Sequence, residues 1–174
     1  MDELIPGLWT WTARHPGWTP ESEQWGPEVR SYALVRGDHV LLFDPQDPPE
    51  QLLEGRTAEI VITATWHKRS SPALGLPVHD TGDTLPEGIE AQPAFYLPEE
   101  RFLWMPEQRA LVAGDSLPNT SQVPDAWLDV PREEYLKALR PLLDLPIVLL
   151  LPTHGDPVLT DGHAHLARVL RNYT

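Results

Sequence analysis

Three apolar runs, each ending abruptly in polar residues, constrain the fold of this chain more than any other feature. They read EIVITATWHKRSS (59–71), RALVAGDSL (109–117) and IVLLLPTHGDPV (147–158). Such runs predict buried strands, and open α/β sheets bind their ligands just past the ends of their strands. His67, Asp115 and His154 each follow one of the runs, and all three side chains can bind a metal ion. The pattern therefore predicts an α/β fold with a polar site at its strand ends.

The composition is typical of a globular protein, and its negative net charge disfavours binding to nucleic acid or anionic membranes. Its 174 residues predict a single domain over 1–174, and its net charge of −13 argues against nucleic acid or anionic membranes as partners. Without cysteine, the chain has no thiolate zinc site and no thiol nucleophile. The N-terminus lacks the apolar segment of a signal peptide, and no run approaches the ~20 residues of a membrane span. We therefore expect a cytoplasmic protein; the sequence does not indicate its oligomeric state.

Turn residues in the first two-thirds of the chain predict mainly strands and hairpins. An opening strand is predicted over 4–14, and a loop rich in proline and glycine over 15–28. Segment 30–45 has a Gly-Asp turn between two apolar runs, which predicts a hairpin. A second hairpin is predicted from strands at 101–105 and 109–113 around the tripeptide Pro-Glu-Gln.

The last third of the chain predicts two helices. Apolar periodicity indicates a helix over 131–145, which we expect Pro141 to bend or shorten. A second helix is predicted over 160–173, with Thr160 or Asp161 as its cap. Hairpins followed by strand–helix pairs fit a mixed sheet with helices outside it.

These segments together resemble the metallo-β-lactamase superfamily, whose fold is an αββα sandwich of mixed β-sheets with outer helices. SYALVRGDHVLLFDP is similar to that family's early hairpin, which ends in an aspartate, here Asp44. EIVITATWHKRSS resembles the strand and loop of the Thr-His-x-His-x-Asp-His motif, and FYLPEERFLWMP resembles the Gly-His-Thr-Pro-Gly segment. LVAGDSL resembles the strand whose aspartate bridges two metals, and LLPTHGDP resembles the final Gly-His loop. The resemblance implies this fold and, for an enzyme, a metal-dependent hydrolase.

The metal ligands of the family are largely replaced in this chain. Asp115 and His154 stand in register with the family's ligands, whereas Tyr96 takes the place of a histidine. When Thr63 is aligned with the motif threonine, His67 falls on a spacer position, whereas a slip of one or two residues makes His67 a ligand and still leaves the others lost. Four other residues then replace the ligands of the first motif: Ala64, Trp66, Lys68 and Arg69. The chain looks most like shorter superfamily members with a Thr-x-x-x-His-x-Arg loop, and the pattern predicts a degenerate site with at most one metal.

One hypothesis is a hydrolase that binds a single Zn²⁺, or Fe or Mn, through His67, Asp115 and His154. A catalytic zinc needs three protein ligands and an open position for water, which these side chains allow. The activated water would attack an ester, thioester or lactone. Lys68 or Arg69 would stabilise the oxyanion. Tyr96, with Lys68 and Arg69, is a candidate catalytic residue.

The other hypotheses need no metal, and because so many ligands are lost we expect the metal-free state to predominate. Lys68 and Arg69 are adjacent cations that suit the carboxylate or phosphate of a small anionic ligand. They also suit an ordinary salt bridge, for instance from Arg69 to Asp80 or Asp115. A structural or interaction protein of the same fold is the third possibility.

Overall fold

The chain divides into two compact units, Met1–Leu85 and Pro86–Thr174. The computed structural model describes residues 1–22, 26–69, 71–94, 99–117, 128 and 130–171. The expectation of one domain over 1–174 stays a prediction. Within the described residues, no helix has the length and apolar character that a membrane crossing requires.

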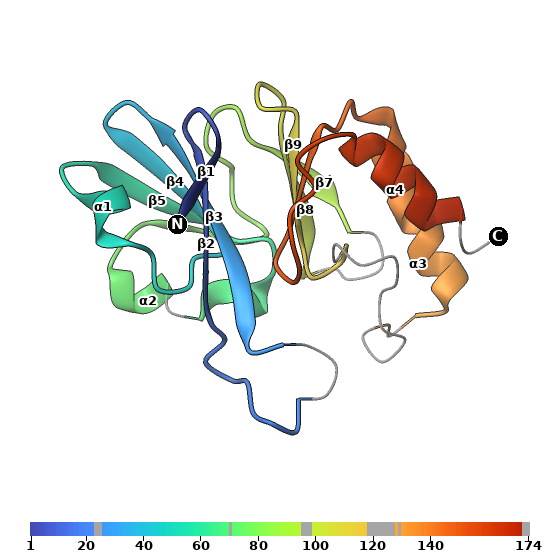
Figure 1. Cartoon of the computed structure of the whole chain (residues 1–174), viewed down its shortest axis with the longest axis horizontal. Helices are drawn as coiled ribbons and strands as arrows, with labels where there is room; N and C mark the ends of the chain where they lie inside the picture. The colour runs from blue at the N-terminus through green and yellow to red at the C-terminus, as the bar shows by residue number, and fades with distance from the viewer. Residues whose placement is uncertain (23–25, 70, 95–98, 118–127, 129, 172–174) are drawn as a thin grey trace. The chain divides into compact units, whose positions relative to one another are not determined.

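The described residues of the first unit form a six-stranded sheet in the order β1-β2-β3-β4-β5-β6 (Figure 1). The strands are β1 (Asp2–Ile5), β2 (Leu8–Arg14), β3 (Glu28–Arg36), β4 (His39–Phe43), β5 (Thr57–Val61) and β6 (Val78–His79). Strands β1 to β4 pair antiparallel, which confirms the hairpin predicted over 30–45. Strands β4, β5 and β6 pair in parallel.

The predicted opening strand over 4–14 is in fact two strands, β1 and β2. Gly7 turns the chain between them with a φ of 81°, a backbone conformation that glycine adopts without strain. The Gly7 carbonyl accepts the Val35 N–H at 2.8 Å, which holds the turn against β3. The apolar pattern of 4–14 conceals this turn because it continues on both sides of the glycine.

Two short helices, α1 (Glu50–Leu53) and α2 (Ser71–Leu74), pack on one face of the six-stranded sheet. The 3-10 turn η1 (Thr65–Lys68) lies between β5 and α2 in the sequence. Because side chains alternate along a strand, Val40 and Leu42 of β4 face the same side as Ile60 of β5. They pack with Leu52 of α1 and Leu74 of α2 into one apolar core.

The described residues of the second unit form a four-stranded sheet in the order β10-β9-β8-β7. The strands are β7 (Glu90–Pro93), β8 (Arg101–Met105), β9 (Ala110–Gly114) and β10 (Leu149–Pro152). Strands β8 and β9 form the hairpin predicted around Pro-Glu-Gln. Strand β10 lies parallel to β9, and its leucines are all buried, as its continuous apolar run predicts.

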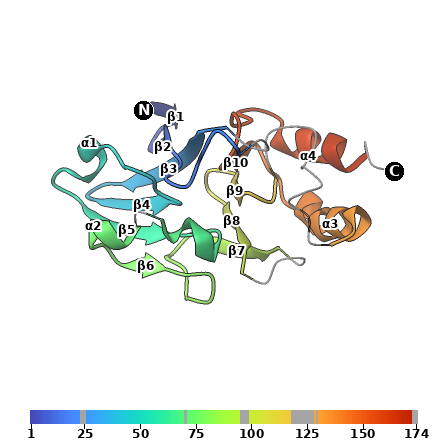
Figure 2. The same ribbon diagram turned by 90° about the horizontal axis from the view of Figure 1, so that it is seen from below.

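Two helices pack on one face of the four-stranded sheet (Figure 2). Helix α3 (Arg132–Leu139) gives way to a 3-10 turn, η3 (Arg140–Asp144), that has Pro141 near its start. This confirms that Pro141 shortens the predicted helix, since proline has no N–H to donate to the preceding turn. Helix α4 (Gly162–Arg171) follows Asp161, whose carbonyl accepts the His165 N–H at 2.9 Å. The core of this unit joins strand and helix residues, among them Phe102, Trp104, Leu111, Tyr135, Leu139, Leu166 and Val169.

We expect Gly162→Ala to lower the free energy of unfolding by about 1–3 kcal/mol because it would overpack the start of α4. A Cβ at Gly162 would lie 2.8 Å from Cγ2 of Ile147 and 2.9 Å from the Val148 carbonyl oxygen. Urea denaturation measures the change. The control is Gly82→Ala, where a Cβ meets nothing within 4 Å. Equal midpoints for the two variants would contradict the packing seen at α4.

We expect His165 to make folding less favourable as the pH falls. Burial, with Arg168 adding to it, lowers the pKa of His165 below its ordinary value of 6.5. The unfolded chain therefore binds this proton more readily, so the free energy of unfolding decreases from pH 6.5 downward to the folded pKa. His165→Gln should flatten this decrease. Urea unfolding at pH 7.5 and 5.5 measures the effect; the same slope in wild type and His165→Gln would refute it.

Candidate functional site

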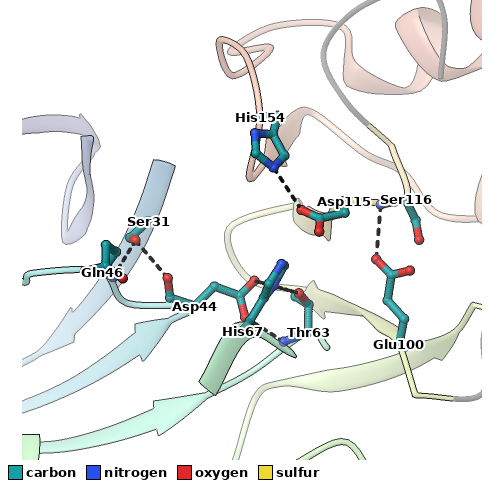
Figure 3. Close-up of polar contacts among 9 residues, drawn as sticks. All are labelled: Ser31, Asp44, Gln46, Thr63, His67, Glu100, Asp115, Ser116 and His154. Carbon is teal, nitrogen blue, oxygen red and sulfur yellow. Dashed lines mark hydrogen bonds and ion pairs between the residues drawn. The ribbon is translucent and has the colours of Figure 1, made fainter. Parts of the chain in front are cut away.

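The first unit places Asp44, Thr63 and His67 in one buried cluster (Figure 3). Asp44 follows β4 and Thr63 follows β5, and parallel neighbours end at the same edge of a sheet. Asp44 Oδ1 accepts the Thr63 backbone N–H at 2.8 Å, and its Oδ2 accepts the Thr63 hydroxyl at 2.6 Å. Nδ1 of His67 lies 2.9 Å from Thr63 Oγ1 and 3.1 Å from Asp44 Oδ2. The exposed fractions of the His67 and Asp44 side chains are 0% and 2%.

Strand β3 supports the backbone of Asp44 from the other side. Asp44 has a φ of 46°, a left-handed conformation that costs a non-glycine residue on the order of 1–3 kcal/mol. The Ser31 hydroxyl donates to the Asp44 carbonyl at 2.8 Å and accepts the Gln46 N–H at 3.0 Å. The indole N–H of Trp11 donates to the Gln46 carbonyl at 2.7 Å. These buried hydrogen bonds hold Asp44 in the conformation that directs its carboxylate to Thr63.

Asp115 and His154 come together in the second unit. Asp115 follows β9 and His154 lies two residues beyond β10, and these strands are parallel neighbours. Nε2 of His154 lies 3.5 Å from Oδ1 of Asp115, and the two side chains are 14% and 23% exposed (Figure 3). Two of the three ligands predicted from the sequence are thus neighbours, whereas His67 belongs to the first unit.

Two buried side chains fix the backbone next to Asp115. A Glu100 carboxylate oxygen accepts the Ser116 N–H at 3.1 Å, and the Tyr135 hydroxyl donates to the Ser116 carbonyl at 2.7 Å. Glu100, Ser116 and Tyr135 are all almost completely buried. The hydrogen bonds restrain both sides of Ser116 and so limit the positions that Asp115 can take.

The loop that carries His154 is closed by its own backbone. Leu150 and Val158 exchange two N–H to carbonyl hydrogen bonds, each 2.9 Å long. The Thr153 N–H donates to the Gly114 carbonyl at 3.1 Å, which joins this loop to the end of β9. The turn containing His154 is therefore fixed relative to the strand that precedes Asp115.

The cationic loop of the first unit already has an ion-pair partner. Lys68 Nζ pairs with an Asp80 carboxylate oxygen, and both side chains are partly exposed. The salt bridge from Arg69 to Asp80 or Asp115 that the sequence suggested stays a prediction. Arg69 is partly buried, with a φ of 24°, and ends η1. Tyr96 lies outside the described residues.

Several site residues escaped the sequence reasoning. Thr63 was considered only for aligning a motif, and Ser31 and Glu100 were not identified at all. Ser31 lies within β3 and Glu100 directly precedes β8, and neither residue belongs to a polar cluster at a strand end. Only the pairing of strands distant in sequence shows what these side chains contact.

Asp115 and His154 fit a divalent metal in donor chemistry. A carboxylate oxygen and an imidazole nitrogen are ligands that Zn²⁺, Fe²⁺ and Mn²⁺ all accept. Within neither unit do the described residues contain three or more His, Asp or Glu side chains grouped so that they could hold a metal ion. The pair supplies two of the three protein ligands that a catalytic zinc requires.

No protein-family model and no curated protein matches this sequence. Solved structures, by contrast, match it over nearly its whole length. A crystal structure of VMB-1 has a TM-score of 0.68 at 14% identity, covering 99% of this chain and 97% of that one. A metallo-β-lactamase from Erythrobacter litoralis has a TM-score of 0.68 at 16% identity, with 98% and 89% covered. One from Pontibacter korlensis has a TM-score of 0.65 at 14% identity, with 98% of both chains covered. The chain therefore has the metallo-β-lactamase fold that its strand-end motifs imply.

Proposed function

We propose that this chain is a hydrolase-like protein that binds a single metal ion, with Asp115 and His154 as the core of its site, and acts on a small molecule. The observation that supports this most is the approach of His154 Nε2 to Asp115 Oδ1, at 3.5 Å. Both residues lie at the ends of parallel strands, which is where sheets of this kind bind ligands.

The surroundings of the pair suit a metal site. Each side chain is mostly buried, and removal from water strengthens electrostatic attraction between a carboxylate and a cation. Glu100 and Tyr135 hold the backbone at Ser116, so Asp115 loses little freedom on binding. A bound metal would supply Lewis-acid chemistry, polarising a carbonyl group and lowering the pKa of a water molecule. That His67 is a third ligand stays a prediction.

The alternative is a metal-free protein that binds small anions through Lys68 and Arg69. The ion pair between Lys68 and Asp80 disfavours it, because an incoming anion would have to displace the Asp80 carboxylate. A partly exposed pair of this kind contributes roughly 0–1 kcal/mol, so the displacement is inexpensive and the alternative needs its own experiment.

We expect wild-type protein purified without chelator and supplied with Zn²⁺ to bind about one metal ion per chain. Zinc should also raise its melting temperature, because a ligand that binds the folded state stabilises it. The Asp115→Asn, His154→Gln double variant should retain less than ~0.2 metal per chain and show no thermal shift. His163→Gln is the matched control, since His163 is an exposed histidine of α4. His67→Gln, in the same series, tests the predicted third ligand.

Metal content is measured by mass spectrometry, and hydrolysis on a panel of small esters, thioesters and lactones. Where wild type hydrolyses a member of the panel, His154→Gln should lose at least about 100-fold in rate, as expected when a metal site is disrupted. Wild-type protein with less than ~0.2 metal per chain and no zinc-dependent shift would overturn the proposal.

Lys68→Ala tests the alternative. If Lys68 serves only its ion pair with Asp80, phosphate and acetate will change the melting temperatures of wild type and Lys68→Ala equally. Lys137→Ala is the matched control, because Lys137 is an exposed lysine of α3. Stabilisation of wild type and Lys137→Ala by either anion, together with its loss in Lys68→Ala, would favour the anion-binding function instead.

A further inference from the structure

Strand β6 is the short last strand in the order of the six-stranded sheet (Figure 2). It contains two residues, Val78 and His79. Its backbone joins β5 where the Ile60 N–H donates to the Pro77 carbonyl at 2.8 Å and the Ile62 N–H donates to the His79 carbonyl at 3.2 Å. A pairing this short gains much from a side chain that reaches the neighbouring strand, and the side chain of His79 does so.

Both ring nitrogens of His79 face oxygen atoms. Nε2 lies 2.7 Å from Oε2 of Glu59 on β5, and Nδ1 lies 2.8 Å from the carbonyl oxygen of Thr84. A carboxylate and a backbone carbonyl only accept hydrogen bonds, so each nitrogen needs a proton to make its bond. The imidazolium form has a proton on both nitrogens and is therefore the form that makes both bonds at once.

The bond to Thr84 closes the loop that follows β6. Within this loop, the Asp83 N–H donates to the Asp80 carbonyl at 2.9 Å, and the Asp80 N–H donates to the Asp83 carboxylate at 2.8 Å. The Asp80 carboxylate pairs with Lys68 of η1. His79 thus connects β5 to a loop whose carboxylate holds a lysine of the cationic turn.

We propose that His79 is a proton-dependent clasp, which holds the loop at 80–84 to strand β5 while its ring has two protons and releases the loop when it loses one. The bond that breaks is the one to Thr84, because a hydrogen bond to a carboxylate is roughly twice as strong as one between neutral groups. The neutral ring keeps its proton on Nε2, and the lone pair of Nδ1 then repels the Thr84 oxygen. The loop, and Lys68 through Asp80, consequently respond to pH.

The surroundings of the clasp allow its proton to exchange with solvent. The side chains of His79 and Glu59 are 25% and 33% exposed, so the ring can lose a proton without unfolding of the sheet. His39 of β4 faces the other oxygen of Glu59, with Nε2 3.8 Å from Oε1. The charged and titratable groups on the elements around the clasp are Glu59, His39, Asp80, Asp83 and Lys68.

The first test is the ¹⁵N NMR spectrum of histidine-labelled protein at pH 7.0, in which the resonances that disappear in His79→Gln identify His79. Wild type should show both ring nitrogens of His79 protonated. Glu59→Gln should show a protonated Nδ1 and an unprotonated Nε2, because an amide can donate to Nε2 where the carboxylate only accepts. His39→Gln alters the other contact of the same carboxylate, so it is the matched control and should keep the wild-type pattern. An unprotonated ring nitrogen of His79 in wild type would overturn the proposal.

The second test follows the loop through the ¹³C chemical shift of the Thr84 carbonyl between pH 6.0 and 9.0. In wild type and His39→Gln this shift should change as the ring loses its proton and releases the carbonyl. In Glu59→Gln it should stay nearly constant, because Nδ1 keeps its proton across the range. Circular dichroism verifies that each variant is folded. A Thr84 shift that does not depend on pH in wild type would refute the release of the loop.

The clasp lies within the first unit and does not rest on the proposed function. Both spectra are recorded without metal or substrate, so their outcome is independent of whether Asp115 and His154 bind zinc.

Discussion

A buried carboxylate must be satisfied by the protein itself, and in the first unit the carboxylate of Asp44 determines how its neighbours are arranged. Leaving such a charge without partners would cost far more than any single hydrogen bond contributes. Thr63 therefore supplies two donors, and Nδ1 of His67 lies 3.1 Å from the same carboxylate. Ser31 holds the strained backbone that directs the carboxylate toward them. The conformation of the turn after β5 therefore depends on the hydrogen bonds that the Asp44 carboxylate accepts from Thr63.

The same logic applies to the second unit, with different residues. Neighbouring parallel strands end at the same edge of a sheet, so Asp115 and His154 meet although 38 residues separate them in the sequence. Glu100 and Tyr135 restrain the intervening backbone, as Ser31 does in the first unit. Each candidate side chain is thus held by a second set of residues that the strand-end motifs do not contain.

Local sequence signals predicted the fold well where the physical cause is local. The Gly-Asp turn at 37–38 indicated the hairpin of β3 and β4, and Pro141 marked the end of α3. Gly7 was overlooked because the apolar pattern continues on both of its sides. The ion pair of Lys68 with Asp80 was not predicted, because the direction of that side chain depends on a 3-10 turn. The motif aspartate and histidine were identifiable, whereas Ser31 and Glu100 depend on pairings between distant strands.

The close approach of α4 to the start of β10 has a consequence for His154. The Gly162 N–H donates to the Val148 carbonyl and the His163 N–H to the Ile147 carbonyl, so the segment from 147 to 163 is tied at its base as well as between Leu150 and Val158. A loop whose ends are already joined has little closure entropy left to lose when it orders. The hydrogen bonds at the start of α4 therefore limit the length of the segment around His154 that can move. Local unfolding of α4 would break these two hydrogen bonds and lengthen the segment that is free to move, so the order of the histidine turn depends on the helix that follows it.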